Sequence, residues 1–99
     1  MNTLTLKIAE TDLASRAKAA LLREKVLTIL SSGSNVDMDL ANVESISDSF
    51  ADELFGVLAA SYGIESLAQR LRVSQATDSL YKVIALNINN RLHQVAASA

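Results

Sequence analysis

The chain has 99 residues, of which 49% are hydrophobic and 20% are charged, and its formal net charge is −2. This length suits one domain over residues 1–99, and the composition is too apolar for a disordered chain. There is no cysteine and no proline. Disulfides, thiolate metal sites and cysteine nucleophiles are therefore excluded, and a compact run of helices and strands is favoured.

The charges are unevenly distributed along the chain. All the lysines and arginines lie within residues 7–25 or 70–91, whereas residues 26–69 hold seven acids and no base. Contact with phosphates requires a basic surface, so the acidic middle argues against nucleic acid as a ligand. It is compatible with a basic protein partner, or simply with solvated carboxylates, some of them at helix N-termini.

Neither a signal peptide nor a membrane span is expected from the sequence. The first residues lack a basic region followed by an apolar one. No stretch approaches the roughly 20 apolar residues that a membrane span requires. We therefore expect a cytoplasmic protein with no membrane association.

The first half of the chain predicts two strands with a helix between them. Residues 3–8 alternate apolar and polar side chains, as in a half-buried strand. A helix is expected from a cap at Thr11 or Asp12 to about Ser31. Val36–Leu40 alternates again and predicts the second strand.

The second half begins with a polar loop over residues 41–48, in which Val43 and Ile46 are the expected anchors to the core. Three helical segments and a strand follow: a helix from about Ser49 to the turn at Gly63, a short helical turn over 64–69, a strand over Leu71–Ser74, and a helix capped by Thr77 or Asp78.

Strands that alternate with helices of this length imply parallel pairing with right-handed crossovers. The expected fold is therefore α/β, a small and mainly parallel sheet in the order β-α-β-α-β-α with packed helices. Sites in such folds lie outside the carboxyl ends of the strands. The most polar loop in that position is Ala41–Asp52.

The segment VESISDSFADEL, from Val43 to Leu54, resembles the STAS-like domains of the DUF4325 type. Their pattern is a strand ending in Asp, a Val, and then Ile-Ser-x-Ser-Phe-Ala-Asp-Glu-Leu. Ser15-Arg16-Ala17 is similar to that family's Ser-Arg-x-x-Ala segment, and the resemblance runs from about Thr3 to Arg91. It implies a STAS-like fold in a bacterial protein.

The wider relatives are STAS domains such as the anti-anti-sigma factors of bacterial partner-switching systems. In those proteins an anti-sigma kinase phosphorylates a serine at the start of a helix, and phosphorylation abolishes binding. Ser49 falls on that serine. The resemblance implies a non-enzymatic signalling and regulatory module that binds a protein, with a GHKL-type ATPase or kinase as partner and no cofactor.

The expected position of Ser49, at a helix N-terminus, is one where backbone amides and the helix dipole stabilise a phosphate. The sequence departs from the anti-anti-sigma pattern, because Phe50 replaces a glycine and Asp52 and Glu53 replace apolar residues. These two carboxylates are expected to repel a phosphoserine. In the alternative interpretation, Ser49 is only the N-cap and Asp52 completes a capping-box-like arrangement.

The expected partner-binding face comprises Ser47, Asp48, Ser49, Phe50, Asp52 and Glu53, with Asp39 and Glu44 as further candidates in the loop. We expect no catalytic residue, because no Ser/His/Asp set can be assembled, and no metal site, because too few ligands are certain. Two other functions stay open. One is a nucleotide or small-ligand sensor that uses the same loop, and the other is a structural domain that self-associates as a homodimer.

Overall fold

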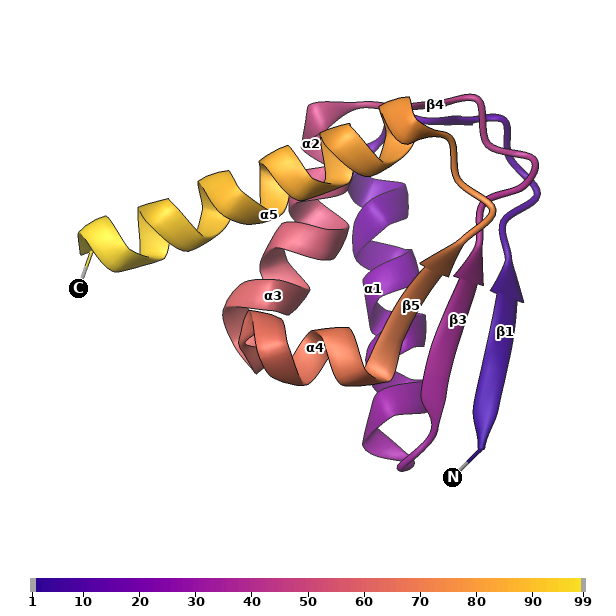
Figure 1. Ribbon diagram of the computed structural model, residues 1–99, viewed down its shortest axis with the longest axis horizontal. Coiled ribbons are helices and arrows are strands. Elements are labelled where there is room, and N and C mark those ends of the chain that lie inside the picture. Colours follow the sequence, from indigo (N-terminus) through magenta and orange to yellow (C-terminus); the bar gives the residue numbers. More distant parts are fainter. Residues whose placement is uncertain (1, 99) are drawn as a thin grey trace.

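The computed structural model describes residues 2–98, with the side chains of residues 2–94, and its centre is a three-stranded parallel sheet (Figure 1). The strands are β1 (Thr3–Lys7), β3 (Asn35–Asp39) and β5 (Leu71–Ser74), in the order β1-β3-β5. Beyond their carboxyl ends, two short parallel strands pair with each other: β2 (Asp12–Leu13) and β4 (Ser45–Ile46).

The helices follow the strands in the expected order. They are α1 (Arg16–Ser31), α2 (Asp48–Ala51), the π-helix η1 (Asp52–Gly56), α3 (Val57–Tyr62), α4 (Ile64–Arg70) and α5 (Asp78–Ser98). The prediction of a mixed α/β fold with a small parallel sheet is confirmed.

The two faces of the sheet differ because side chains alternate along each strand. One face carries the aligned apolar side chains of Leu6, Met38 and Val73, and Met38 is completely buried against the helices. The other face carries polar residues such as Asp37 and Arg72, which lie opposite each other in adjacent strands. The helices therefore cover the apolar face, and none of the helices that the structure describes lies over the polar one (Figure 1).

The expected start of the first helix, at Thr11 or Asp12, is wrong. The helix begins at Arg16, and the Oγ of its N-cap Ser15 accepts a hydrogen bond from Lys18 N. Asp12 instead pairs with Ser45, and this pairing buries Leu13. A strand of two residues depends on a partner far along the chain, so local periodicity gives no sign of it.

The loop before the second helix is less irregular than predicted, because it contains β4. The anchors Val43 and Ile46 are both buried, as expected. The helix itself begins at Asp48 rather than Ser49, and it widens into the π-helix η1 before it ends near Gly63. Gly63 has a φ of 82°, the left-handed conformation that favours glycine at such an end.

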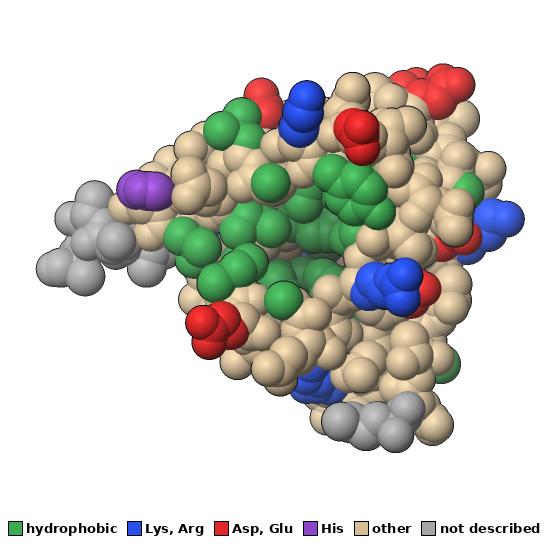
Figure 2. All heavy atoms as spheres, viewed as in Figure 1, with side chains coloured by type: hydrophobic (Ala, Val, Ile, Leu, Met, Phe, Trp, Pro, Cys, Tyr) green, Lys and Arg blue, Asp and Glu red, His purple; other side chains and the backbone are tan. Residues whose placement is uncertain are grey.

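Across the described residues, no helix combines the length and apolar character that crossing a bilayer requires. The last helix, α5, packs over η1 and α3, and its C-terminal part extends away from the body (Figure 1). Apolar side chains gather in a hollow that α5, α4 and β5 frame (Figure 2).

Candidate functional site

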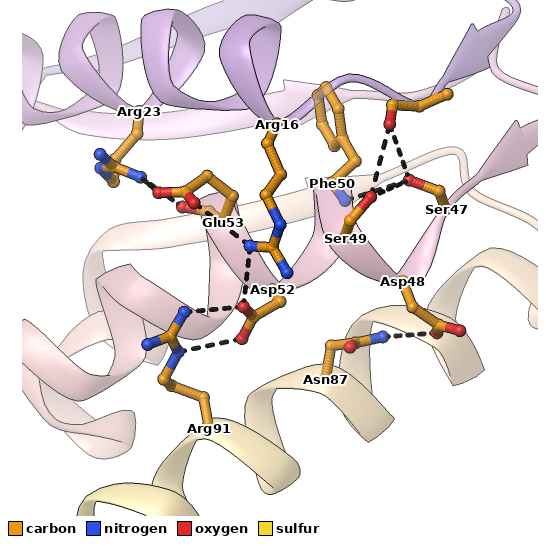
Figure 3. A network of polar contacts seen from close by, with 11 residues as sticks. Arg16, Arg23, Ser47, Asp48, Ser49, Phe50, Asp52, Glu53, Asn87 and Arg91 are labelled. Atoms are coloured by element: carbon orange, nitrogen blue, oxygen red, sulfur yellow. Dashed lines mark hydrogen bonds and ion pairs between the residues drawn. The ribbon is translucent and has the colours of Figure 1, made fainter.

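The candidate site is built around the first turn of α2, where Ser47 and Ser49 lie side by side (Figure 3). Ser47 Oγ accepts a hydrogen bond from Phe50 N at 3.1 Å and donates one to the carbonyl of Ala14, also at 3.1 Å. Ser47 is therefore the N-cap of α2, and it ties this helix to the segment before α1.

Ser49 is not the N-cap, which corrects one of the two interpretations of this residue. It is the second residue of α2, it is half-buried, and its Oγ lies 3.1 Å from Ser47 Oγ. Its only other hydrogen bond in the described part of the chain is a long one, 3.5 Å, to the carbonyl of Ala14. The hydroxyl of Ser49 therefore caps no helix.

The carboxylates of Asp52 and Glu53 are held by three arginines from two other helices (Figure 3). Arg91 of α5 binds both oxygens of Asp52, with Nε and Nη2 at 2.9 and 2.7 Å. Arg23 of α1 binds a carboxylate oxygen and the carbonyl of Glu53. Arg16 reaches both acids, at 3.1 and 3.2 Å. The capping-box role expected for Asp52 is therefore wrong.

These contacts shift the pKa values of the groups involved. Burial on its own raises the pKa of Asp52, but the hydrogen bonds from Arg91 and Arg16 outweigh it and hold that pKa below its ordinary value. The hydrogen bond from Arg23 lowers the pKa of Glu53 against the effect of burial. Hydrogen bonds to both acids raise the pKa of Arg16. Both acids are therefore ionised at neutral pH, and their charge is neutralised.

Asp48 connects the site to the last helix. Its Oδ1 accepts a hydrogen bond from Asn87 Nδ2 at 2.8 Å, and the same amide donates to the carbonyl of Val83 at 2.9 Å. Asn87 is buried on the face of α5 that packs against α2 and η1. A buried amide with satisfied donors fixes the position of α5 against the first turn of α2.

Phe50 does not belong to the exposed face as expected, because its side chain is 1% exposed and belongs to the core. Asp39 and Glu44 make no hydrogen bond or ion pair to residues 47–53 within the described part of the chain. Asp39 Oδ1 accepts a hydrogen bond from Ala41 N, and Glu44 is an exposed residue whose backbone N–H donates to Thr11. The accessible part of the predicted face is therefore Asp48 with the half-buried Ser47, Ser49, Asp52 and Glu53.

The arginines and Asn87 are the residues that the sequence analysis missed. Arg16 and Arg23 are seven residues apart, so they lie on one face of α1. This spacing predicts a basic helix face that could pair with acidic side chains. Asn87 interrupts an apolar stripe with a side chain that must find partners if it is buried. Arg91 gave no comparable signal, because its partner depends on how α5 packs.

The chain is a small α/β domain of the kind that the sequence predicts. It has a parallel sheet with helices on one face, and the first turn of α2 contains two serines and follows a short strand. The family model of the STAS-like domain of unknown function (DUF4325) matches residues 18–81, and the chain belongs to this family. The match includes Val43–Leu54 but not Ser15–Ala17. Neither the curated proteins nor the solved structures gave a match.

Proposed function

We propose that the chain is a non-enzymatic regulatory module that binds a protein partner, and that phosphorylation of Ser49 releases this partner. The binding surface consists of the first turn of α2 and the adjacent residues 14–16. The observation that carries the proposal is that Ser49 is half-exposed and has no capping role. A modification of its hydroxyl leaves the cap of the helix intact.

The electrostatics of the surface favour an added phosphate. Ser49 is the second residue of α2, where free backbone amides and the helix dipole stabilise negative charge. The arginines neutralise Asp52 and Glu53, so the expected repulsion between these acids and a phosphoserine is much reduced. Phosphorylation adds about −1.5 to −2 charges, enough to reverse an interaction at this surface.

Arg16 is the side chain suited to receive the phosphate. It follows two residues after Ala14, the carbonyl of which lies 3.5 Å from Ser49 Oγ. It also binds Asp52, which is three residues after Ser49 on the same helix. The Arg16 side chain is 52% exposed, and Asp52 keeps its contacts with Arg91 if Arg16 turns away. Arg16 can therefore exchange one anion for another.

A kinase of the GHKL ATPase type is the proposed partner, on the strength of the STAS resemblance. Such a partner would bind the unmodified surface and phosphorylate Ser49. The phosphate adds negative charge beside the exposed Asp48, so a partner that contacts this surface through acidic or apolar groups is released.

The test is capture of partners from the cells that make the protein, with identification by mass spectrometry. Wild type is compared with Ser49→Ala and Ser49→Asp. We expect a partner that binds wild type and Ser49→Ala, and whose recovery with Ser49→Asp falls at least about tenfold. The same spectra report whether Ser49 carries a phosphate.

Ser79→Asp is the matched control. Ser79 is the second residue of α5, after Thr77 and Asp78, so this variant also adds a carboxylate to the first turn of a helix. It is expected to retain the partner. Equal recovery with Ser49→Asp and wild type would contradict the switch, and recovery lost equally with both Asp variants would show a general charge effect.

Self-association is a second candidate function, favoured by the apolar hollow in Figure 2. The helices that frame it carry Ile64 and Tyr81, which are 45% and 40% exposed. Apolar side chains exposed on neighbouring elements mark contact surfaces. Sedimentation at several protein concentrations tests this function, with Ile64→Glu expected to dissociate any dimer that uses the hollow.

A further inference from the structure

The outer edge of β1 has free backbone hydrogen-bonding groups. On its inner side, Asn35 N donates to the carbonyl of Asn2 at 2.8 Å, and Ile8 N donates to the carbonyl of Asp39 at 3.0 Å. Backbone groups in a strand point alternately to its two sides, so those of Thr3, Thr5 and Lys7 face outward. Since β1 ends the order β1-β3-β5, no strand within the described residues covers them (Figure 1).

A pocket of about 420 Å³ lies beside this edge, between the end of β1 and α1. Its apolar lining includes Leu13, Leu21 and Leu22, and Phe50 also contributes. Leu21 is 72% exposed, and Leu4, on the helix-side face of β1, is 47% exposed. The apolar layer between sheet and helix therefore continues outward past β1, where the sheet has ended.

Three lysines surround the pocket: Lys7, Lys18 and Lys25. Lys18 and Lys25 are seven residues apart on α1, with Leu21 and Leu22 between them, so these four residues share one face of the helix. The arginines of α1 point elsewhere and are neutralised by Asp52 and Glu53. Two acids, Glu10 and Asp12, share the lining with the three lysines, so the rim keeps a positive balance of charge. In the described part of the chain the lysines have no ion pair, and Asp12 accepts a hydrogen bond from Ser45.

We propose that the edge of β1 and this lysine-rimmed pocket bind an extended, acidic segment of a partner protein, which adds to the sheet as a further strand. The segment pairs its backbone with Thr3, Thr5 and Lys7, places an apolar side chain in the pocket, and directs carboxylates at the lysines. Apart from the buried Phe50, this site shares no residue with the Ser47–Glu53 surface, and it does not depend on phosphorylation of Ser49.

Other occupants fit the surface less well. A second copy that paired through β1 would bring the Lys7, Lys18 and Lys25 side chains of both chains to one seam, where they repel. An anionic membrane supplies negative charge, but it does not supply donors and acceptors at the spacing of a strand edge. An acidic extended peptide provides backbone partners for the edge of β1, an apolar side chain for the pocket and carboxylates for the lysines.

The experiment selects binders of the full chain from a displayed library of random peptides of about twelve residues, long enough to pair along one strand. We expect the enriched peptides to be acidic, with apolar residues at alternate positions. One of them, labelled with fluorescein, is then titrated against protein variants by fluorescence anisotropy.

Two variants test the two parts of the site. Lys18→Glu/Lys25→Glu is expected to weaken binding by about tenfold or more, because attraction becomes repulsion. Thr5→Pro removes an outward N–H without breaking the ladder to β3, and it is expected to weaken binding by about tenfold. Lys82→Glu, a charge reversal on an exposed residue of α5, is the matched control and should leave the affinity unchanged.

Amide hydrogen exchange provides a readout that is specific to strand addition. The bound peptide should slow exchange at Thr3, Thr5 and Lys7 by about tenfold or more, while Leu4 and Leu6, which already face β3, change much less. Failure to enrich acidic peptides, or affinities that all the variants leave unchanged, would overturn the proposal. Binding to phosphatidylglycerol vesicles but not to peptides, or a dimer that Thr5→Pro dissociates, would overturn it in favour of a membrane or a second copy.

Discussion

Ser47 and Ser49 are chemically identical side chains in one helical turn, yet their hydroxyl groups have different environments. Ser47 Oγ makes hydrogen bonds to Phe50 N and to the carbonyl of Ala14. Among the described residues, Ser49 Oγ contacts its neighbour Ser47 and makes a long contact to the carbonyl of Ala14. The stability of the helix start therefore depends on the Ser47 hydroxyl, and the Ser49 hydroxyl is available for modification.

Ser47→Ala is expected to lower the free energy of unfolding by about 1 kcal/mol, the usual effect of removing an N-cap. Ser49→Ala should change the free energy of unfolding by less than about 0.5 kcal/mol, since no cap is lost. Urea unfolding followed by circular dichroism measures both. Equal losses in the two variants would show that Ser49 shares the capping role.

Asp52 and Glu53 should make stability depend on pH in the acid range. Their pKa values are lower in the folded chain than in the unfolded one, so each contributes stability above its unfolded pKa, and this stability is lost as the pH falls through the folded pKa. We expect the urea midpoint to decrease below about pH 4.5, where unfolded carboxyls begin to bind protons. The double variant Asp52→Asn/Glu53→Gln should have a lower urea midpoint than wild type at pH 7, and its midpoint should fall less on acidification. A fall in the midpoint equal to that of wild type would contradict this origin of the pH dependence.

At the scale of elements, η1 and α5 pack directly against each other in the candidate site. A methyl group on Gly56 would lie 2.9 Å from Asp52 Oδ1 and 3.1 Å from Arg91 Cβ. The absence of a side chain at Gly56 thus allows α5 to come near enough for Arg91 and Asn87 to reach Asp52 and Asp48. The glycine positions the ion pairs without taking part in them.

Gly56→Ala is expected to lower the free energy of unfolding by about 1–3 kcal/mol, because the added methyl overpacks this contact. Thermal unfolding of the variant and of wild type measures the loss. In an ordinary helix position the same change raises stability by about 0.5–1 kcal/mol, because glycine is entropically unfavourable there. A gain of that size would show that α5 has room to move outward.

Some element boundaries were predictable and others were not. The turn at Gly63 and the cap of α5 at Thr77 follow from residue type, and Thr77 Oγ1 accepts the hydrogen bond from Leu80 N that the cap requires. The pairing of Asp12–Leu13 with Ser45–Ile46 was missed, because each strand of two residues is stabilised by the other. The widening at η1 was missed as well, since no residue of that segment carries a local signal for it.

For the whole molecule, the polar network and the apolar core join the same elements. α5 contributes Leu80 and Ile84 to the core and holds Asp48 and Asp52 through Asn87 and Arg91. Within residues 2–98 the central sheet has three strands, and it cannot bury its apolar face without the helices. We therefore expect α5 to unfold together with the sheet rather than separately.

Unfolding in urea should be a single cooperative transition, with a slope of about 1 kcal/mol per molar. Circular dichroism reports the helices, and two-dimensional nuclear magnetic resonance reports residues of the sheet such as Met38 and Val73. Coincident midpoints are expected from the two methods. An earlier midpoint for resonances of α5 alone would show that this helix is only loosely attached.

The sequence by itself determined the order of strands and helices, the parallel sheet and most of the core, because alternation and helical periodicity are local patterns that burial enforces. Val43–Leu54 was enough to indicate the family. Only the tertiary structure decided which serine caps α2, which arginines neutralise Asp52 and Glu53, and which edge of the sheet stays open. These outcomes depend on side chains that are distant in the sequence and that packing brings together. Local sequence patterns do not predict such pairings.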